Sequence, residues 1–270
     1  MNPIRALFVP LQPSVDHGSE DQVVYEEVLP DLYLRDYVHC YWHLFSTHRL
    51  DDPFVYRVVS DGCVDVLLER QRPDEPYITG FSKRYITYEL GHHFYYLGIR
   101  FLPAGFPAIF DVSASYLTNK FLPLVDVCPV LHSSLLLRTS ELKDLVQSSV
   151  VFDEILKAFI EARGKPLAID QRLMNAMDQI LQSRGQINVT ELDVGVSERQ
   201  LRRLFDHYFG GSAKTFAKVI RFQNILGSGQ SLGQRMGNQI FYREGYYDQA
   251  HFIKEFKAFY GVTPGEVFRP

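Results

Sequence analysis

Three arginines in the C-terminal part of the chain stand at spacings that suit contact with DNA. Arg199, Arg202 and Arg203 fall on one side of a predicted helix, while Leu201 and Phe205 fall on its other side. A guanidinium group donates two parallel hydrogen bonds, which match both the edge of guanine and the oxygens of a phosphate. This helix is therefore predicted to carry a DNA-contacting face.

A later segment repeats the same arrangement with different side chains. Gln249, His251 and Lys254 point outward on a predicted helix that packs on Phe252 and Phe256. A glutamine amide can pair with adenine, whereas a lysine ammonium group suits a phosphate. The segment predicts a second DNA-contacting face.

Each of these helices begins with a residue that can cap it. Ser197, with Gln200 three residues later, fits a capping box, and Asp248 fits the same role in the second segment. Gly195 and Gly245 supply tight turns just before the caps. A helix, a glycine turn and a capped second helix form the helix-turn-helix plan, in which the start of the second helix enters the major groove. Ser197 and Asp248 are therefore included among the expected DNA-binding positions.

The two segments belong to an internal repeat with an offset of 51 residues. The aligned pairs are Arg203 and Lys254, Phe205 and Phe256, Tyr208 and Phe259, Phe209 and Tyr260, Gly210 and Gly261, and Ser212 and Thr263. Each copy thus predicts a short helix, an aromatic pair, a glycine stop and a new helix start.

Residues 195–205 and 245–257, closed by Gly261-Val262-Thr263-Pro264, resemble the AraC/XylS family of regulators. The resemblance implies seven helices and two recognition helices that enter successive major grooves on one face of the DNA. It also implies that residues 216–226 form the rigid connecting helix, because grooves on one face recur about 34 Å apart.

The first unit departs from the family pattern. Between Leu192 and Gly195 it is shorter than usual, which predicts a shortened support helix. Ala213 stands where proline is common, and Phe241 stands in the second unit where alanine is common. These departures keep open an alternative function, in which the chain pairs with another regulator and does not bind DNA.

The N-terminal half is predicted to be rich in strands. Aromatic and β-branched residues alternate from Val23 to Phe101, and the glycine turns at Asp61-Gly62 and Gly91 favour hairpins. In the segment 37–45, alternation places Val38 on one face with Cys40, Trp42 and Leu44, and His39 on the other with His43. Short strands at this spacing favour a barrel over a sandwich. The motifs are Tyr41-Trp42-His43, residues 61–65, residues 98–103 and residues 117–127. They resemble a domain fused to such regulators, which implies a cupin-like barrel followed by helices.

A joint between two domains is predicted at Gly164, where a helical pattern ends in glycine and Pro166 follows. We therefore expect a β-rich sensing or dimerisation domain over residues 1–164 and a DNA-binding domain over residues 165–270. The first part holds 14 basic and 22 acidic residues, and the second holds 14 basic and 10 acidic residues. Only the second part is expected to attract a polyanion.

Composition excludes several classes of protein. The three cysteines, Cys40, Cys63 and Cys128, are too few for a disulfide framework, and none forms a C-x-x-C pair. No secretory segment or membrane span is expected, so a cytoplasmic location is predicted. No phosphate-binding glycine loop or G-x-S-x-G elbow is present, and neither an enzyme activity nor a cofactor is expected.

A metal-dependent cupin enzyme remains a weaker alternative. His39 and His43 could lie on one strand face with one of His92 and His93, since adjacent residues of a strand point to opposite faces. The main hypothesis is a DNA-binding regulator without a metal. Its expected partners are double-stranded DNA, RNA polymerase, a small-molecule effector and a second copy of the chain.

Overall fold

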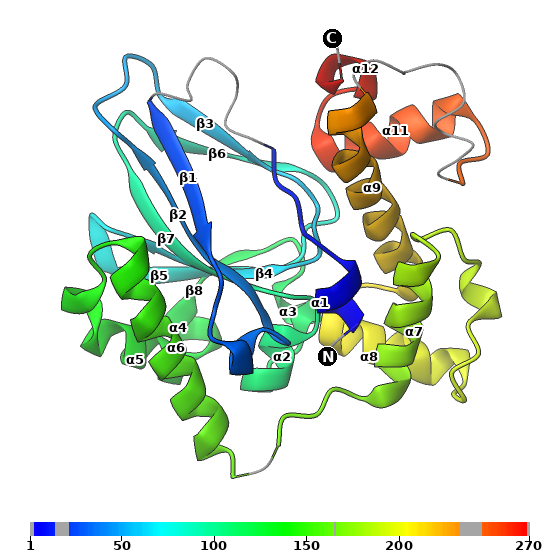
Figure 1. Ribbon diagram of the computed structural model, residues 1–270, viewed down its shortest axis with the longest axis horizontal. Helices are drawn as coiled ribbons and strands as arrows, with labels where there is room; N and C mark the ends of the chain where they lie inside the picture. The colour runs from blue at the N-terminus through cyan, green and yellow to red at the C-terminus, as the bar shows by residue number, and fades with distance from the viewer. Residues whose placement is uncertain (1–2, 14–21, 165, 233–244, 269–270) are drawn as a thin grey trace.

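The computed structural model describes residues 3–13, 22–164, 166–232 and 245–268 (Figure 1). Strands dominate up to Pro123, and helices dominate from Leu124 onward. The expected α+β class is confirmed: a β-rich N-terminal part with helices precedes an all-helical C-terminal part.

A six-stranded antiparallel sheet forms the centre of the N-terminal part, in the order β1-β2-β7-β4-β5-β8. Its strands are β1 (Val23–Val28), β2 (Val38–Ser46), β4 (Val64–Glu69), β5 (Arg72–Thr79), β7 (Tyr95–Phe101) and β8 (Phe121–Pro123). The central strand β7 buries Leu97, Ile99 and Phe101, because it has a neighbour on each side and is covered on both faces.

A second sheet of two strands, β3 (Phe54–Val58) and β6 (Ile86–Gly91), packs on one face of the larger sheet. The core between them contains Cys40, Trp42 and Phe94, with Phe54 stacked on Phe94 at a ring-centre distance of 5.5 Å.

The prediction of hairpins at Asp61-Gly62 and Gly91 is wrong. β3 pairs with β6, and β4 pairs with β5 and β7, so each of these turns links one sheet to the other. Both glycines do adopt positive φ angles, and the Asp61 carboxylate accepts the amide of Cys63 at 2.9 Å. The local turn chemistry was predicted correctly, but it does not determine which strands pair.

A β-bulge in β2 changes the faces predicted for that strand. Val38 pairs with Phe101 and Cys40 with Arg100, so His39 is an extra residue in the ladder. Val38 consequently packs in the same core as Tyr41, while Cys40 and Trp42 pack in the opposite one. The bulge turns His39 to the side of Cys40, whereas alternation had separated these two residues.

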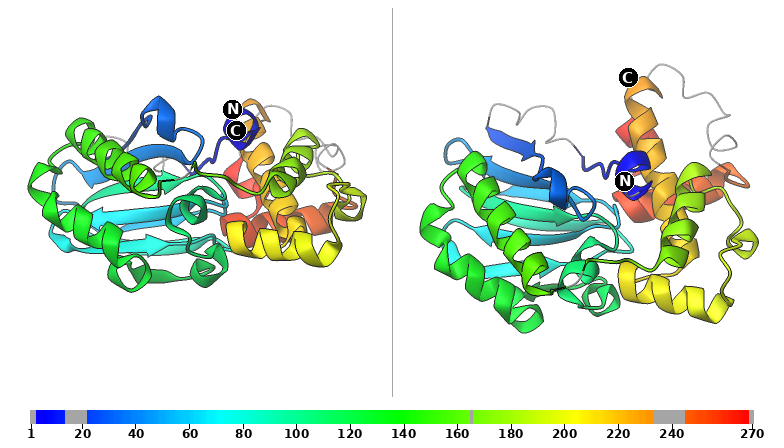
Figure 2. Two further views of the ribbon diagram at one scale, coloured as in Figure 1. Left: turned by 90° about the horizontal axis from the view of Figure 1, so that it is seen from below. Right: turned by 60° about the horizontal axis from the view of Figure 1, so that its bottom comes forward.

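Helices cover the other face of the large sheet (Figures 1 and 2). They are η1 (Leu32–Leu34), α2 (Gly105–Phe110), α3 (Ala114–Leu117), α4 (Leu124–Val127), α5 (Pro129–Leu137), η2 (Thr139–Glu141) and α6 (Leu145–Ala162). The helical pattern expected before Gly164 is α6, whose apolar stripe of Phe152, Ile155, Leu156 and Ile160 is buried against the sheet. The Asp144 side chain caps this helix by accepting the amide of Gln147.

The C-terminal part is built from helices around a separate core. They are α7 (Gln171–Gln182), η3 (Val189–Glu191), α8 (Glu198–Phe209), α9 (Ala213–Leu232), α11 (Gln249–Tyr260) and α12 (Pro264–Val267). The apolar sides of α7 and α9 are buried in this core.

The start of the chain packs against this C-terminal core. Helix α1 (Pro3–Leu7) lies on α7, and Ile4 is fully buried there. The Gln223 side chain of α9 accepts the amide of Leu11 at 2.7 Å and donates to the carbonyl oxygens of Leu11 and Ser60. This buried amide therefore joins three segments that are far apart in sequence.

Among the residues that the structure describes, no helix combines the length and the apolar character needed to span a membrane.

We expect Gln223→Ala to destabilise the protein by about 1–3 kcal/mol, because the partly buried amide and carbonyl of Leu11 and the buried carbonyl of Ser60 lose their side-chain partner. Chemical denaturation measures the change. Asn224→Ala is the matched control, since the Asn224 side chain donates to Ile220 within its own helix. Equal effects of the two substitutions would contradict the bridging role of Gln223.

Candidate nucleic-acid interface

The cap of α8 has the geometry expected from the sequence. The Ser197 hydroxyl accepts the amide of Gln200 at 3.3 Å, and the Gln200 side chain accepts the amide of Ser197 at 3.1 Å. Gly210 ends the helix with a φ of 82°, a left-handed conformation that glycine adopts without strain. Two backbone amides at the start of α8 are thus satisfied within the protein, which fixes where the helix begins.

Helix α8 separates an apolar face from a basic one. Leu201 and Phe205 are buried, whereas Arg199, Arg202 and Arg203 are exposed. The outward placement predicted for the three arginines is therefore confirmed, and their contact with DNA stays a prediction.

Helix α11 repeats this design. The Asp248 carboxylate accepts the amide of His251 at 2.7 Å and caps the helix. Gln249, His251 and Lys254 are exposed, while the repeat partner of Phe205, Phe256, is fully buried.

Two phenylalanines of α9 hold helices α8 and α11. Phe216 contacts Phe205 and Phe209 of α8, with ring centres 5.9 and 5.1 Å apart. Phe222 contacts Phe256 of α11 and also Phe259, with ring centres 5.5 and 5.2 Å apart. Each copy of the repeat therefore uses its aromatic residues to attach one helix to the same connecting helix.

A buried carboxylate links α11 to α9. Sequence reasoning did not predict it. Glu255 is 7% exposed, and it accepts a hydrogen bond from the Tyr246 hydroxyl at 2.9 Å. The Lys218 ammonium group of α9 lies 2.6 Å from the other carboxylate oxygen. The sequence did contain a signal for this contact, because Glu255 falls on the inner side of α11, one residue before Phe256. A buried charge needs a partner, so an ion pair could have been expected there.

An open groove of about 850 Å³ is lined mainly by α8, α9 and residues 186–190, and His251 of α11 also reaches it. Its basic and histidine side chains come from α8, α9 and α11, and they are Arg199, Arg202, Lys214, Lys218, Arg221 and His251. Arg203 instead lines a separate hollow of about 450 Å³, beside Ser113 of the N-terminal part and Arg172 of α7. Thus the structure brings together Arg199, Arg202 and His251, but not Arg203.

The support helix of the first unit is short, as the sequence indicated. Only a single 3₁₀ turn, η3, stands between α7 and the turn at Gly195. The support segment of the second unit, with Phe241, lies outside the described residues.

The histidines proposed for a metal-cupin enzyme do not converge. The His43 ring contacts Glu26 and Tyr95, and the His93 ring contacts Ser46. The His92 ring contacts the carbonyl oxygen of Leu50, and the bulge turns His39 away from His43. Within the described ranges, the one group of possible ligands that includes His39 contains neither His43 nor His93.

The N-terminal part contains a buried charged cluster that the sequence did not reveal. The Arg100 guanidinium group donates to Asp65 at 3.1 Å and lies 3.8 Å from Asp61, and the Trp42 indole donates to Asp65 at 2.8 Å. Beside this cluster, a cavity of about 500 Å³ is bounded by Val9–Pro13 and strand β1, and Tyr56 also lines it.

Comparison with known proteins identifies both parts of the chain. A family described as "Helix-turn-helix domain" matches residues 192–270, and a "Domain of unknown function (DUF6597)" matches residues 26–123. No curated protein matches.

Solved structures of ToxT from Vibrio cholerae are similar over most of the chain. One shares 12% identity with a TM-score of 0.40 and covers 92% of this chain and 97% of ToxT. ToxT bound to (E)-4-(8-methylnaphthalen-1-yl)but-3-enoic acid shares 14% identity with a TM-score of 0.39, and covers 92% and 97% of the two chains. The helix-turn-helix match is of the AraC type. The chain therefore joins an N-terminal DUF6597 domain to a C-terminal helix-turn-helix domain of the AraC type.

Proposed function

We propose that residues 165–270 bind a specific double-stranded DNA sequence through α8 and α11, and that residues 1–164 sense a small molecule, mediate dimerisation or do both. The observation that carries this proposal is the pair of capped helices on α9, each with a polar outer face and an aromatic inner face. Such a pair can present two readers to one DNA face.

The DNA contacts are assigned by position. Arg199 and Arg202 line the groove that Lys214 and Lys218 of α9 also line, so this surface combines base-reading and phosphate-binding chemistry. On α11, Gln249 and His251 are assigned to base edges and Lys254 to phosphate. Ser197 and Asp248 fix the helix starts, where backbone amides and the helix dipole favour a phosphate. We assign Arg203 to a phosphate contact, because it lies apart from the groove.

The N-terminal cavity supports an effector site. Its volume of about 500 Å³ falls within the usual range for small-molecule pockets, and its walls combine apolar residues with Tyr25, Glu27 and His39. We also propose that the domain is cupin-like and that two copies pair through α5 and α6, where Leu137, Val146 and Val150 are exposed. Light scattering over a concentration series would measure the pairing.

The regulator is proposed to act in the cytoplasm by changing the recruitment of RNA polymerase, without catalysing a reaction. The three cysteines are free and buried, which suits a reducing compartment.

A second candidate function is an interaction protein that does not bind DNA. The single 3₁₀ turn at Val189–Glu191 favours it, because the first reader then has less support than a full helix would give. Salt dependence separates the two functions. If 6–10 phosphates are contacted, DNA affinity falls by about 10³–10⁵-fold between 50 and 200 mM salt. Absence of binding at 50 mM salt would favour the interaction protein.

We expect Arg202→Ala to cost about 1–3 kcal/mol of binding free energy and to relax the base preference in one half-site. Lys254→Ala is expected to weaken all duplexes alike and to lower the salt slope by about 1. Selection from a random duplex pool, followed by titration at several salt concentrations, measures both effects. Lys143→Ala, which removes the same charge from the N-terminal part, is the control. Unchanged sequence preference in Arg202→Ala would contradict the assignment.

The Glu255 contacts between α9 and α11 predict a separate result. Glu255→Ala should destabilise the protein by about 1–3 kcal/mol, because the buried Tyr246 hydroxyl loses its acceptor. It should also weaken the half-site read by α11 more than the half-site read by α8. Denaturation and half-site titrations test this pattern, with exposed Glu161→Ala as control. An equal loss of affinity at both half-sites would contradict the prediction that the Glu255 contacts position α11 and not α8.

A further inference from the structure

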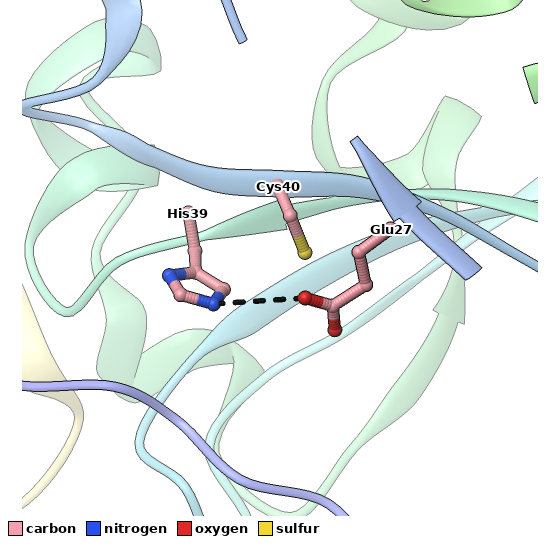
Figure 3. Close-up of side chains that lie close together, drawn as sticks. All are labelled: Glu27, His39 and Cys40. Atoms are coloured by element: carbon pink, nitrogen blue, oxygen red, sulfur yellow. Dashed lines mark ion pairs between the residues drawn. The ribbon is translucent and has the colours of Figure 1, made fainter. Parts of the chain in front are cut away.

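The bulge in β2 creates a group of three different ligand types beside the cavity. His39 and Cys40 are adjacent in sequence and yet lie on the same side of the strand. Glu27 of the neighbouring strand β1 pairs with Trp42, two residues beyond Cys40, so its side chain reaches the same face. Figure 3 shows the three side chains directed toward a common point.

The distances between these atoms suit a shared ligand. One imidazole nitrogen, one sulfur and one carboxylate oxygen all lie within 4.8 Å of one another. His39 Nε2 is 4.0 Å from Glu27 Oε2. His39 and Cys40 are buried, while the Glu27 side chain is 35% exposed and gives the group access to the cavity, which Glu27 and His39 both line.

Tyr25 and Arg100 contact one carboxylate oxygen of Glu27, Oε1, which leaves Oε2 directed toward His39. The Tyr25 hydroxyl donates to Glu27 Oε1, and the Arg100 guanidinium group lies 3.9 Å from this same oxygen. Hydrogen bonds of this kind orient carboxylates that bind metals. The charge of Arg100 is itself offset by Asp65 and Asp61.

We propose that Glu27, His39 and Cys40 bind a zinc ion, with water from the cavity as the fourth ligand. Thiolate, imidazole and carboxylate are the ligands that Zn²⁺ takes in proteins, and a tetrahedral site with three protein ligands keeps one position open. The Cys40 proton leaves to solvent as the sulfur binds the ion. This inference goes beyond the proposed regulator, because it does not depend on DNA binding.

Arg5 of α1 makes zinc binding compete with a contact of the N-terminal segment. Its Nη1 lies 3.1 Å from His39 Nδ1 and donates to the His39 carbonyl oxygen at 2.8 Å. Since a guanidinium group only donates, Nδ1 is the acceptor and Nε2 carries the ring proton. Coordination through Nε2 moves this proton to Nδ1, which then faces another donor. Zinc therefore breaks the Arg5–His39 side-chain bond, next to Ile4 in the C-terminal core.

The test is a Zn²⁺ titration of the metal-free full chain, repeated with Co²⁺ as a spectroscopic substitute. We expect one zinc per chain and a sulfur-to-cobalt charge-transfer band. Cys40→Ser and His39→Gln should remove both, whereas Cys128→Ser, which changes a buried cysteine in another core, should keep both. Glu27→Gln, at a more exposed position, should weaken binding by at least about tenfold. Circular dichroism checks the fold, and Glu27→Gln decides the question if either buried variant fails to fold.

The competition with Arg5 predicts a substitution that strengthens zinc binding, whereas the substitutions of the ligands weaken it. Arg5→Ala should tighten zinc binding several-fold, because the competing donor is removed from His39 Nδ1. Zinc binding that persists in Glu27→Gln and Cys40→Ser at full affinity would overturn the site. Unchanged or weaker affinity in Arg5→Ala would overturn the competition.

Discussion

The architecture of the C-terminal domain depends on the attachment of two helices to one. Phe216 and Phe222 of α9 each contact the aromatic residues of a different helix, α8 or α11. These two attachment points are six residues apart on α9, so they lie only about 9 Å apart along its axis. A shared rigid helix therefore fixes the position of α8 relative to α11, since neither helix by itself could hold a fixed distance from the other.

The N-terminal domain contacts both α8 and α11 near the ends of these helices. Phe81 stacks on Phe209 at the end of α8, with ring centres 4.5 Å apart, and the Thr118 hydroxyl donates to the carbonyl oxygen of Gly210. The backbone amide of Tyr85 donates to the carbonyl oxygen of Ala258 near the end of α11. A rearrangement of the N-terminal domain would therefore act on both units. The contacts of Gln223 with residues 11 and 60 give the same coupling to α9.

Local patterns predicted the helical domain well because its determinants are close together in sequence. Caps at Ser197 and Asp248, glycine stops and the 51-residue repeat each depend on a few neighbouring residues. The exposure of the basic side chains follows from helical periodicity in the same way. The partner of Glu255 could not be predicted, because Lys218 is 37 residues earlier in the chain.

The β-rich domain was predicted less completely, because strand pairing is a long-range property. The turn at Asp61-Gly62 has the expected backbone, yet its flanking strands belong to different sheets. The single extra residue at His39 reverses the alternation, and no periodicity in the sequence reveals it. The charged cluster of Arg100, Asp65 and Asp61 depends on the same strand pairing, so sequence reasoning missed it as well.

Hydroxyl-radical footprinting of the full chain on its selected duplex tests the central claim most directly. If α8 and α11 enter successive major grooves, two protected regions should appear on one face of the DNA, centred about 10–10.5 base pairs apart. One protected region, or two on opposite faces of the duplex, would contradict the account.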